Sequence, residues 1–110
     1  MDDLTKPAYA MVQINMKNPE EFMERYANDV LPMLQRWGVE MIAGSMTPIT
    51  KEGDFTGNWV AILKFSNMEA AEAWYNSSEY KPYLELRLNE LTDFTSLVFV
   101  EGMQTNTPAA

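Results

Sequence analysis

Hydrophobic and polar residues alternate near the start of the chain, over residues 8–16. One face of this segment would carry only apolar side chains, namely Ala8, Ala10, Val12, Ile14 and Met16. The other face would mix apolar and polar side chains, namely Tyr9, Met11, Gln13 and Asn15. A period of two places successive side chains on opposite faces of an extended backbone, so the pattern predicts a β-strand.

The pattern then changes to helical spacing. Asn18 suits the N-cap of a helix, Pro19 suits its first position, and Glu21 suits its third. An apolar stripe at intervals of three and four residues follows: Phe22, Tyr26, Val30, Met33, Leu34 and Trp37. Gly38 is typical of a C-terminal stop. Because Pro32 lacks a backbone N–H, we expect a kink about four residues earlier, near Asn28.

The middle of the chain predicts two strands joined by a long loop. Residues 39–44 form a short apolar segment, and residues 58–65 form a longer one, Asn-Trp-Val-Ala-Ile-Leu-Lys-Phe. The residues between them, 45–57, include Pro48, Gly53 and Gly57, which are typical of turns. This loop could hold one edge strand.

The C-terminal half predicts two helices and a last strand. Ser66 and Glu69 have the spacing of a capping box, which predicts a helix over residues 66–76. Two consecutive serines interrupt the pattern, and a further helix is expected from about residue 79 to residue 91. The apolar segment 94–101 predicts a strand. The order of elements is therefore βαββαβ, an α+β pattern.

The length of 110 residues indicates one domain, expected over residues 1–102, with residues 103–110 as a flexible C-terminal tail. Two strands, at residues 59–63 and 97–100, are apolar on both faces. In an antiparallel sheet with helices on one face, the other face is normally polar. We expect a second copy of the chain to cover it, which predicts a homodimer. The alternative is a surface with a few exposed apolar residues.

The charge balance excludes several classes of partner. Lys and Arg number 8 against 16 Asp and Glu, so the net charge is −8. The basic residues are scattered from Lys6 to Arg87 and form no patch, so we expect no nucleic-acid partner. No window approaches the ~18 apolar residues of a membrane span, and the acidic start Met1-Asp2-Asp3-Leu4 is unlike a signal peptide. We therefore expect no membrane partner and a cytoplasmic location.

The chain contains no cysteine and no histidine. This composition excludes disulfides, thiolate or imidazole metal sites, thiol nucleophiles and a Ser-His-Asp triad. No Asp/Asn-rich loop has EF-hand spacing. We expect no metal and no cofactor.

Motifs in the second half of the chain resemble a known family. They are a Gly53-Asp54-Phe55 loop, an apolar strand ending at Phe65, the helix start Glu69-Ala70-Ala71, the segment Trp74-Tyr75-x-Ser77-x-Glu79-Tyr80, then Arg87 and Val100-Glu101-Gly102. Over roughly residues 7–102 the chain resembles the domain-of-unknown-function 1330 family (DUF1330). Where that family often has His-Gly after the first helix, this chain has Trp37-Gly38. Where it often has Arg-Gly after the second strand, this chain has Ala43-Gly44.

The resemblance implies a ferredoxin-like monomer, a βαββαβ antiparallel sheet with helices on one face, that pairs as a dimeric α/β barrel. The wider superfamily includes small cofactor-free monooxygenases, isomerases and haem enzymes. The family itself has no settled activity, so the resemblance implies a fold and not a reaction.

Arg87 is the candidate site residue with the clearest chemistry. On a helical wheel it lies among apolar and aromatic residues, namely Tyr80, Tyr83, Leu84 and Leu91. An arginine stays charged, and a buried charge needs a carboxylate or an anionic ligand. The guanidinium could bind a ligand anion, or pair with a carboxylate such as Asp54 or Glu79, or extend to water.

Further candidates are aromatic or polar. Trp74, Tyr80 and Tyr26 lie at helical spacing and would either form core or line a pocket with tyrosine hydroxyls as polar groups. Asn15 could donate an amide N–H to a ligand, or be solvated or interfacial. Asp54 could be a general base or a turn residue.

Three functions remain open. The first is binding of a small apolar or aromatic anionic molecule in a pocket between sheet and helices. The second is a cofactor-free oxygenase or isomerase of the dimeric α/β barrel type, in which a carboxylate, a tyrosine or the substrate would transfer protons. The third is a non-catalytic dimer with a structural role. The proposed ligand-binding residues are Arg87, Trp74, Tyr80, Tyr26, Asn15 and Asp54, and no catalytic residue is assigned.

Overall fold

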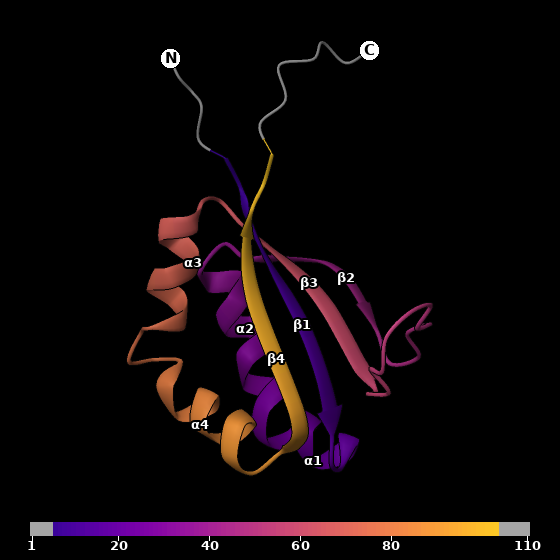
Figure 1. Ribbon diagram of the computed structural model, residues 1–110. Coiled ribbons are helices and arrows are strands. Elements are labelled where there is room, and N and C mark those ends of the chain that lie inside the picture. Colours follow the sequence, from indigo (N-terminus) through magenta and orange to yellow (C-terminus); the bar gives the residue numbers. More distant parts are fainter. Residues whose placement is uncertain (1–5, 104–110) are drawn as a thin grey trace, which may run out of the picture.

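A computed structural model describes residues 6–103 and has two layers, a sheet and the helices that cover one of its faces (Figure 1). Four antiparallel strands form the sheet in the order β2-β3-β1-β4. Their bounds are β1 (Ala8–Met16), β2 (Glu40–Ser45), β3 (Trp59–Phe65) and β4 (Thr92–Glu101). This order of elements and strands confirms the predicted α+β class and the ferredoxin-like βαββαβ arrangement.

The register of the sheet puts the alternating residues of β1 where the sequence pattern placed them. Val12 lies opposite Ala61 of β3 and Leu97 of β4, and all three face the helices. The helix-facing residues of β1 are all buried: Ala8, Ala10, Val12, Ile14 and Met16. This face is therefore one wall of the core.

The first helical region is not one uniform helix. It consists of α1 (Pro19–Phe22), a π-helical turn η1 (Met23–Ala27) and α2 (Asn28–Arg36). The Asn18 side chain accepts a hydrogen bond from the backbone N–H of Glu21, 3.1 Å away, which confirms the predicted N-cap. The interruption expected near Asn28 takes the form of the π-turn, whose last hydrogen bond runs from Asn28 N–H to the carbonyl of Met23.

Two helices follow β3, α3 (Met68–Tyr75) and α4 (Lys81–Asn89). The N-cap of α3 is Asn67, not Ser66, because the extended backbone of Asn67 lets its Oδ1 accept from Ala70 N–H at 2.7 Å. Ser77 connects the two helices: its Oγ donates to the carbonyl of Trp74 at 2.7 Å and accepts from Tyr80 N–H at 3.1 Å.

The loop between β2 and β3 contains no strand, so the edge strand considered for residues 45–57 is absent. Of the predicted C-terminal tail, only Met103 belongs to the described residues, and the acidic start Met1–Leu4 lies outside them. Within residues 6–103 no helix has both the length and the apolar character needed to cross a membrane.

The face of the sheet opposite the helices is apolar at its centre. Met11 of β1 pairs with Val98 of β4 and Ile62 of β3 across this face. Met11 is 50% exposed and Val98 is 52% exposed. In the single chain this outer face therefore lies open to solvent, although its centre is as apolar as a core.

Candidate functional site

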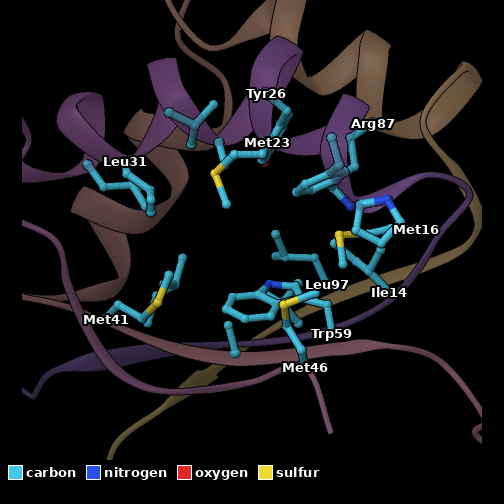
Figure 2. Close-up of a pocket in the computed structure, with 18 of the residues that line it drawn as sticks. Ile14, Met16, Met23, Tyr26, Leu31, Met41, Met46, Trp59, Arg87 and Leu97 are labelled. Atoms are coloured by element: carbon cyan, nitrogen blue, oxygen red, sulfur yellow. The ribbon is translucent and has the colours of Figure 1, made fainter.

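A cavity of about 150 Å³ lies between the first helical region and the helix-facing side of the sheet (Figure 2). The helical wall comes from α1, η1 and α2, and the sheet wall from all four strands. Of the nineteen described residues that line it, eighteen are uncharged and the exception is Arg87. The cavity is thus an apolar chamber with one cationic group.

Arg87 lies at one end of this chamber, near Met16 and Ile14 (Figure 2). Its side chain comes from α4 and is only 2% exposed. The Nε atom donates to the hydroxyl of Tyr80 at 3.4 Å, and Nη1 donates to the hydroxyl of Thr95 on β4. The helical-wheel prediction of a guanidinium inside the apolar stripe is therefore confirmed by the geometry.

No carboxylate among the described residues pairs with Arg87. Glu79, one predicted partner, instead pairs with Arg36 at 2.7 Å and accepts from the indole N–H of Trp37 at 2.9 Å. Asp54, the other, is an exposed residue of the loop before β3. The groups that contact the guanidinium are neutral hydroxyls, which leave its charge uncompensated.

Two tyrosines form a hydroxyl pair beside Arg87. Tyr26 of η1 and Tyr80, the residue before α4, share a hydrogen bond between their hydroxyl oxygens. Burial of its hydroxyl and the neighbouring Tyr80 raise the pKa of Tyr26 well above its usual value near 10, and this outweighs the opposing effect of Arg87. Burial opposes the charge of Arg87, but Tyr80 and Tyr26 raise the arginine's pKa, so the guanidinium stays protonated.

Trp74 of α3 packs on Tyr80, the tyrosine that contacts Arg87. Its side chain is 1% exposed and lines the cavity, and its ring centroid lies 4.1 Å from that of Tyr80. The indole Nε1 is buried and has no hydrogen-bond partner among residues 6–103. A buried donor without an acceptor is uncommon in folded proteins. We refer to the end of the cavity that holds Arg87 as the polar end.

The opposite end of the cavity has a flexible apolar rim. Figure 2 places Leu31 and Met41 across the cavity from Arg87, with Met23 above and Met46 below. All four side chains are exposed hydrophobics. Methionine is unbranched and adaptable, so three methionines and a leucine make a rim that can adjust to what passes between them.

Trp59 of β3 forms much of the sheet-side floor (Figure 2). It lies against Gly44 of the neighbouring strand β2, where a Cβ would be 3.0 Å from the Cη2 atom of the indole. The absence of a side chain at Gly44 therefore lets the ring of Trp59 lie close to the sheet and keeps the chamber open.

The structure brings together four of the six predicted ligand-binding residues. Arg87, Trp74 and Tyr26 line the cavity. The hydroxyl of Tyr80 accepts a hydrogen bond from Arg87 and shares one with the hydroxyl of Tyr26. Asn15 and Asp54 lie elsewhere, in a hollow formed with Phe55, Thr56, Gly57 and Phe94. Asn15 faces away from the helices, and its amide donates to Asp93 at 3.2 Å.

Sequence reasoning did not single out the floor, the rim or Thr95. The sequence does contain a signal for Trp59, because the alternation of its strand puts it on the same face as Ala61 and Leu63. The rim methionines carry none, because a methionine in an apolar pattern is normally core. Thr95 was missed because only the register of the sheet places it opposite Ile14 and beside Arg87.

The described lining combines one cationic group with an apolar wall. No Asp or Glu of residues 6–103 lines the cavity, so among these residues its proton-transfer group would have to be Tyr26. In the part of the chain that the structure describes, no three Asp or Glu side chains cluster in a way that could hold a metal ion.

Comparisons with solved structures show the same fold at low identity. The RPA0582 protein of unknown function from Rhodopseudomonas palustris is 15% identical with a TM-score of 0.71, covering 94% of this chain and 88% of that chain. Methylated RPA0582 is 13% identical with a TM-score of 0.74, covering 96% of this chain and 87% of that chain. An uncharacterized NIPSNAP-like domain protein from Burkholderia xenovorans is 12% identical with a TM-score of 0.58, covering 96% and 92%.

No curated protein matches the chain. A family model does match, that of the domain of unknown function DUF1330, over residues 7–103. This match spans all four strands and every helix described above, and it agrees with the motifs around Trp74, Tyr80 and Arg87. The chain belongs to the DUF1330 family.

Proposed function

We propose that this protein binds a small apolar or aromatic anion in the cavity between the helices and the sheet, with the anionic group at Arg87. The observation that carries the proposal is the state of Arg87: a buried, protonated guanidinium at the end of an apolar chamber, which among the described residues bonds only to hydroxyls. An anionic ligand would supply the charge that residues 6–103 do not place there.

A buried charge is strongly unfavourable unless an opposite charge and hydrogen bonds offset the lost hydration. The hydroxyls of Tyr80 and Thr95 satisfy two of the five N–H groups of the guanidinium and none of its charge. A carboxylate entering from the methionine rim would find both a charge partner and an apolar enclosure for its body.

The proposal is tested by thermal melts of the wild type and of Arg87→Met, with and without a panel of small aromatic acids. Acids that bind the folded protein raise its stability by about 2.7 kcal/mol at a hundred times their dissociation constant. We expect this stabilisation in the wild type and its loss in Arg87→Met. The free variant should be as stable as the wild type or more stable, since an uncompensated charge has been removed.

The matched control is Arg25→Met. Arg25 is an arginine with carboxylate partners, Glu21 at 2.7 Å and Glu90 at 2.8 Å, on the exposed side of the first helical region. Acid-dependent stabilisation should persist in this variant. A strongly destabilised Arg87→Met, together with no effect of any acid on the wild type, would refute ligand binding and assign Arg87 a structural role.

We also propose that the protein is a homodimer that pairs through the outer face of the sheet, as a dimeric α/β barrel. Met11, Ile62 and Val98 form an apolar centre there that no helix of the described chain covers. An interface of this apolar character buries on the order of 2,000 Å² or more. Sedimentation at micromolar concentration should give twice the mass of one chain, and a clean monomer would refute the pairing.

A further inference from the structure

We infer that the preferred ligand is an acid with a single ring, of the size of benzoate, which enters acid group first and receives a hydrogen bond from the indole N–H of Trp74. This inference rests on the proposed function and narrows it to a class of ligand. It depends on the unpartnered Trp74 Nε1, on the contacts that Trp74 and Arg87 both make with Tyr80, and on the size of the chamber.

The Trp74 N–H is the donor that we assign to the acid group of the ligand. It is buried and lacks an acceptor, while the other two tryptophans differ: the Trp37 N–H donates to Glu79 on the surface, and the Trp59 side chain is only partly buried. Burial without an acceptor is unfavourable for an indole N–H. An oxygen brought in by a ligand would relieve that cost, so the free site favours a ligand that carries acceptors.

Trp74 and Arg87 reach the same end of the cavity through a common neighbour. Tyr80 packs its ring on Trp74 with centroids 4.1 Å apart and accepts the hydrogen bond from Nε of Arg87 at 3.4 Å. Trp74 and Arg87 are among the residues that line the cavity, whereas Tyr80 is not. A carboxylate has two oxygens, so one can accept from the guanidinium and the other from the indole.

The orientation of the ligand follows from the two ends of the chamber. Figure 2 shows Arg87 at the end opposite Leu31 and Met41, and the described lining residues between them are apolar apart from the hydroxyl of Tyr26 and the indole N–H of Trp59. An acid group left at the methionine rim would keep its water and gain at most the N–H of Trp59, without the charge of Arg87. The acid therefore goes inward, and the apolar body lies along Trp59 and Phe22 towards the rim.

The size of the chamber limits that body. A volume of about 150 Å³ is comparable to that of an engineered apolar cavity that binds benzene. Drug-sized pockets are at least twice as large. One ring with a carboxylate fits this volume, while a fused pair of rings would have to displace Trp59 or the rim methionines.

The test uses three probes, benzoate, toluene and 2-naphthoate, on the wild-type protein and on Trp74→Phe. Calorimetry measures affinity, and the indole N–H resonances in a ¹⁵N–¹H spectrum report on the hydrogen bond. We expect benzoate to move the Trp74 resonance downfield and to bind Trp74→Phe about tenfold more weakly, a loss of about 1.4 kcal/mol. Toluene, which has no acceptor, should bind both proteins alike and leave that resonance near its free position.

Trp37→Phe is the matched control, because it removes an indole N–H that serves a surface carboxylate outside the cavity. Benzoate affinity should be unchanged in it. If Trp74→Phe does not fold, the Trp74 resonance in the wild-type spectrum still shows whether benzoate accepts the hydrogen bond.

The outcomes separate this inference from the proposed function. Benzoate binding with no change at the Trp74 resonance and no loss in Trp74→Phe would overturn the role of the indole and leave acid binding at Arg87 intact. Binding of 2-naphthoate as tight as that of benzoate would overturn the size limit. No binding of either acid to the wild type would overturn both the inference and the proposed function.

Discussion

The raised pKa of Tyr26 predicts a specific loss of stability in alkaline solution. Burial and the neighbouring Tyr80 raise this pKa in the folded state, while the same tyrosine in the unfolded chain titrates near 10. Above pH 10 the unfolded state therefore holds fewer protons than the folded state, and the free energy of unfolding falls as pH rises. For one such group the loss is about 1 kcal/mol between pH 10 and pH 11. Below pH 9 the contribution of Tyr26 is complete and constant.

Urea unfolding at a fixed protein concentration, measured from pH 8 to pH 11, tests this prediction. We expect Tyr26→Phe to lose about 1 kcal/mol less than the wild type between pH 10 and pH 11. Tyr83→Phe is an informative comparison, because the pKa of Tyr83 is raised chiefly by its hydrogen bond to Asp29 at the surface. The contribution of Tyr83 to the pH dependence of the free energy of unfolding should weaken at high salt, because exposed charges are screened. The contribution of Tyr26 should persist. Identical pH dependence in wild type and Tyr26→Phe would refute the assignment of a buried hydroxyl pair.

Three further predictions concern the cap, the floor and the outer face. Asn67→Ala should lower the free energy of unfolding by about 1 kcal/mol, and Ser66→Ala by much less, in thermal melts; equal losses would contradict the assigned N-cap. Gly44→Val should push the Trp59 ring into the cavity and weaken toluene binding in calorimetry, and unchanged affinity would contradict the role of the floor. Val98→Glu should convert the dimer to monomer in sedimentation without unfolding it, and a persistent dimer would place the interface elsewhere.

The fold was predictable because its signals are local. The alternation in β1 and the spacing from Phe22 to Trp37 each fit one period, and each period has one buried face. Turn residues such as Gly38, with its φ of 76°, end elements where an L side chain would be strained. The N-cap of α3 was placed one residue early because Ser66 and Asn67 are both good caps, and only the backbone geometry separates them.

The site was predictable only in part because it is assembled from distant segments. The position of Arg87 on its helix reveals a charge inside an apolar stripe, and that is a local signal. The contact of Tyr26 with Tyr80 and of Arg87 with Thr95 depends on how the helices cross the sheet and on strand register. The π-turn that carries Tyr26 inserts an extra residue in its helical turn, which a regular helical wheel does not represent.

The strand order has a consequence for how the chain folds as it is synthesised. β1 lies between β3 and β4, so the first strand made is completed by the last, with Ala8 opposite Glu101. At a synthesis rate of about 5–20 residues per second, several seconds pass between the synthesis of β1 and the release of β4 from the ribosome. During this interval the edge of β1 that pairs with β4 is unpaired. During that time the helix-facing side of the sheet lacks Leu97 and Thr95, so the chamber cannot close around Arg87. A nascent chain of this topology therefore acquires its binding site in a single late step, and stalled or truncated chains should expose the open edge of β1 to aggregation.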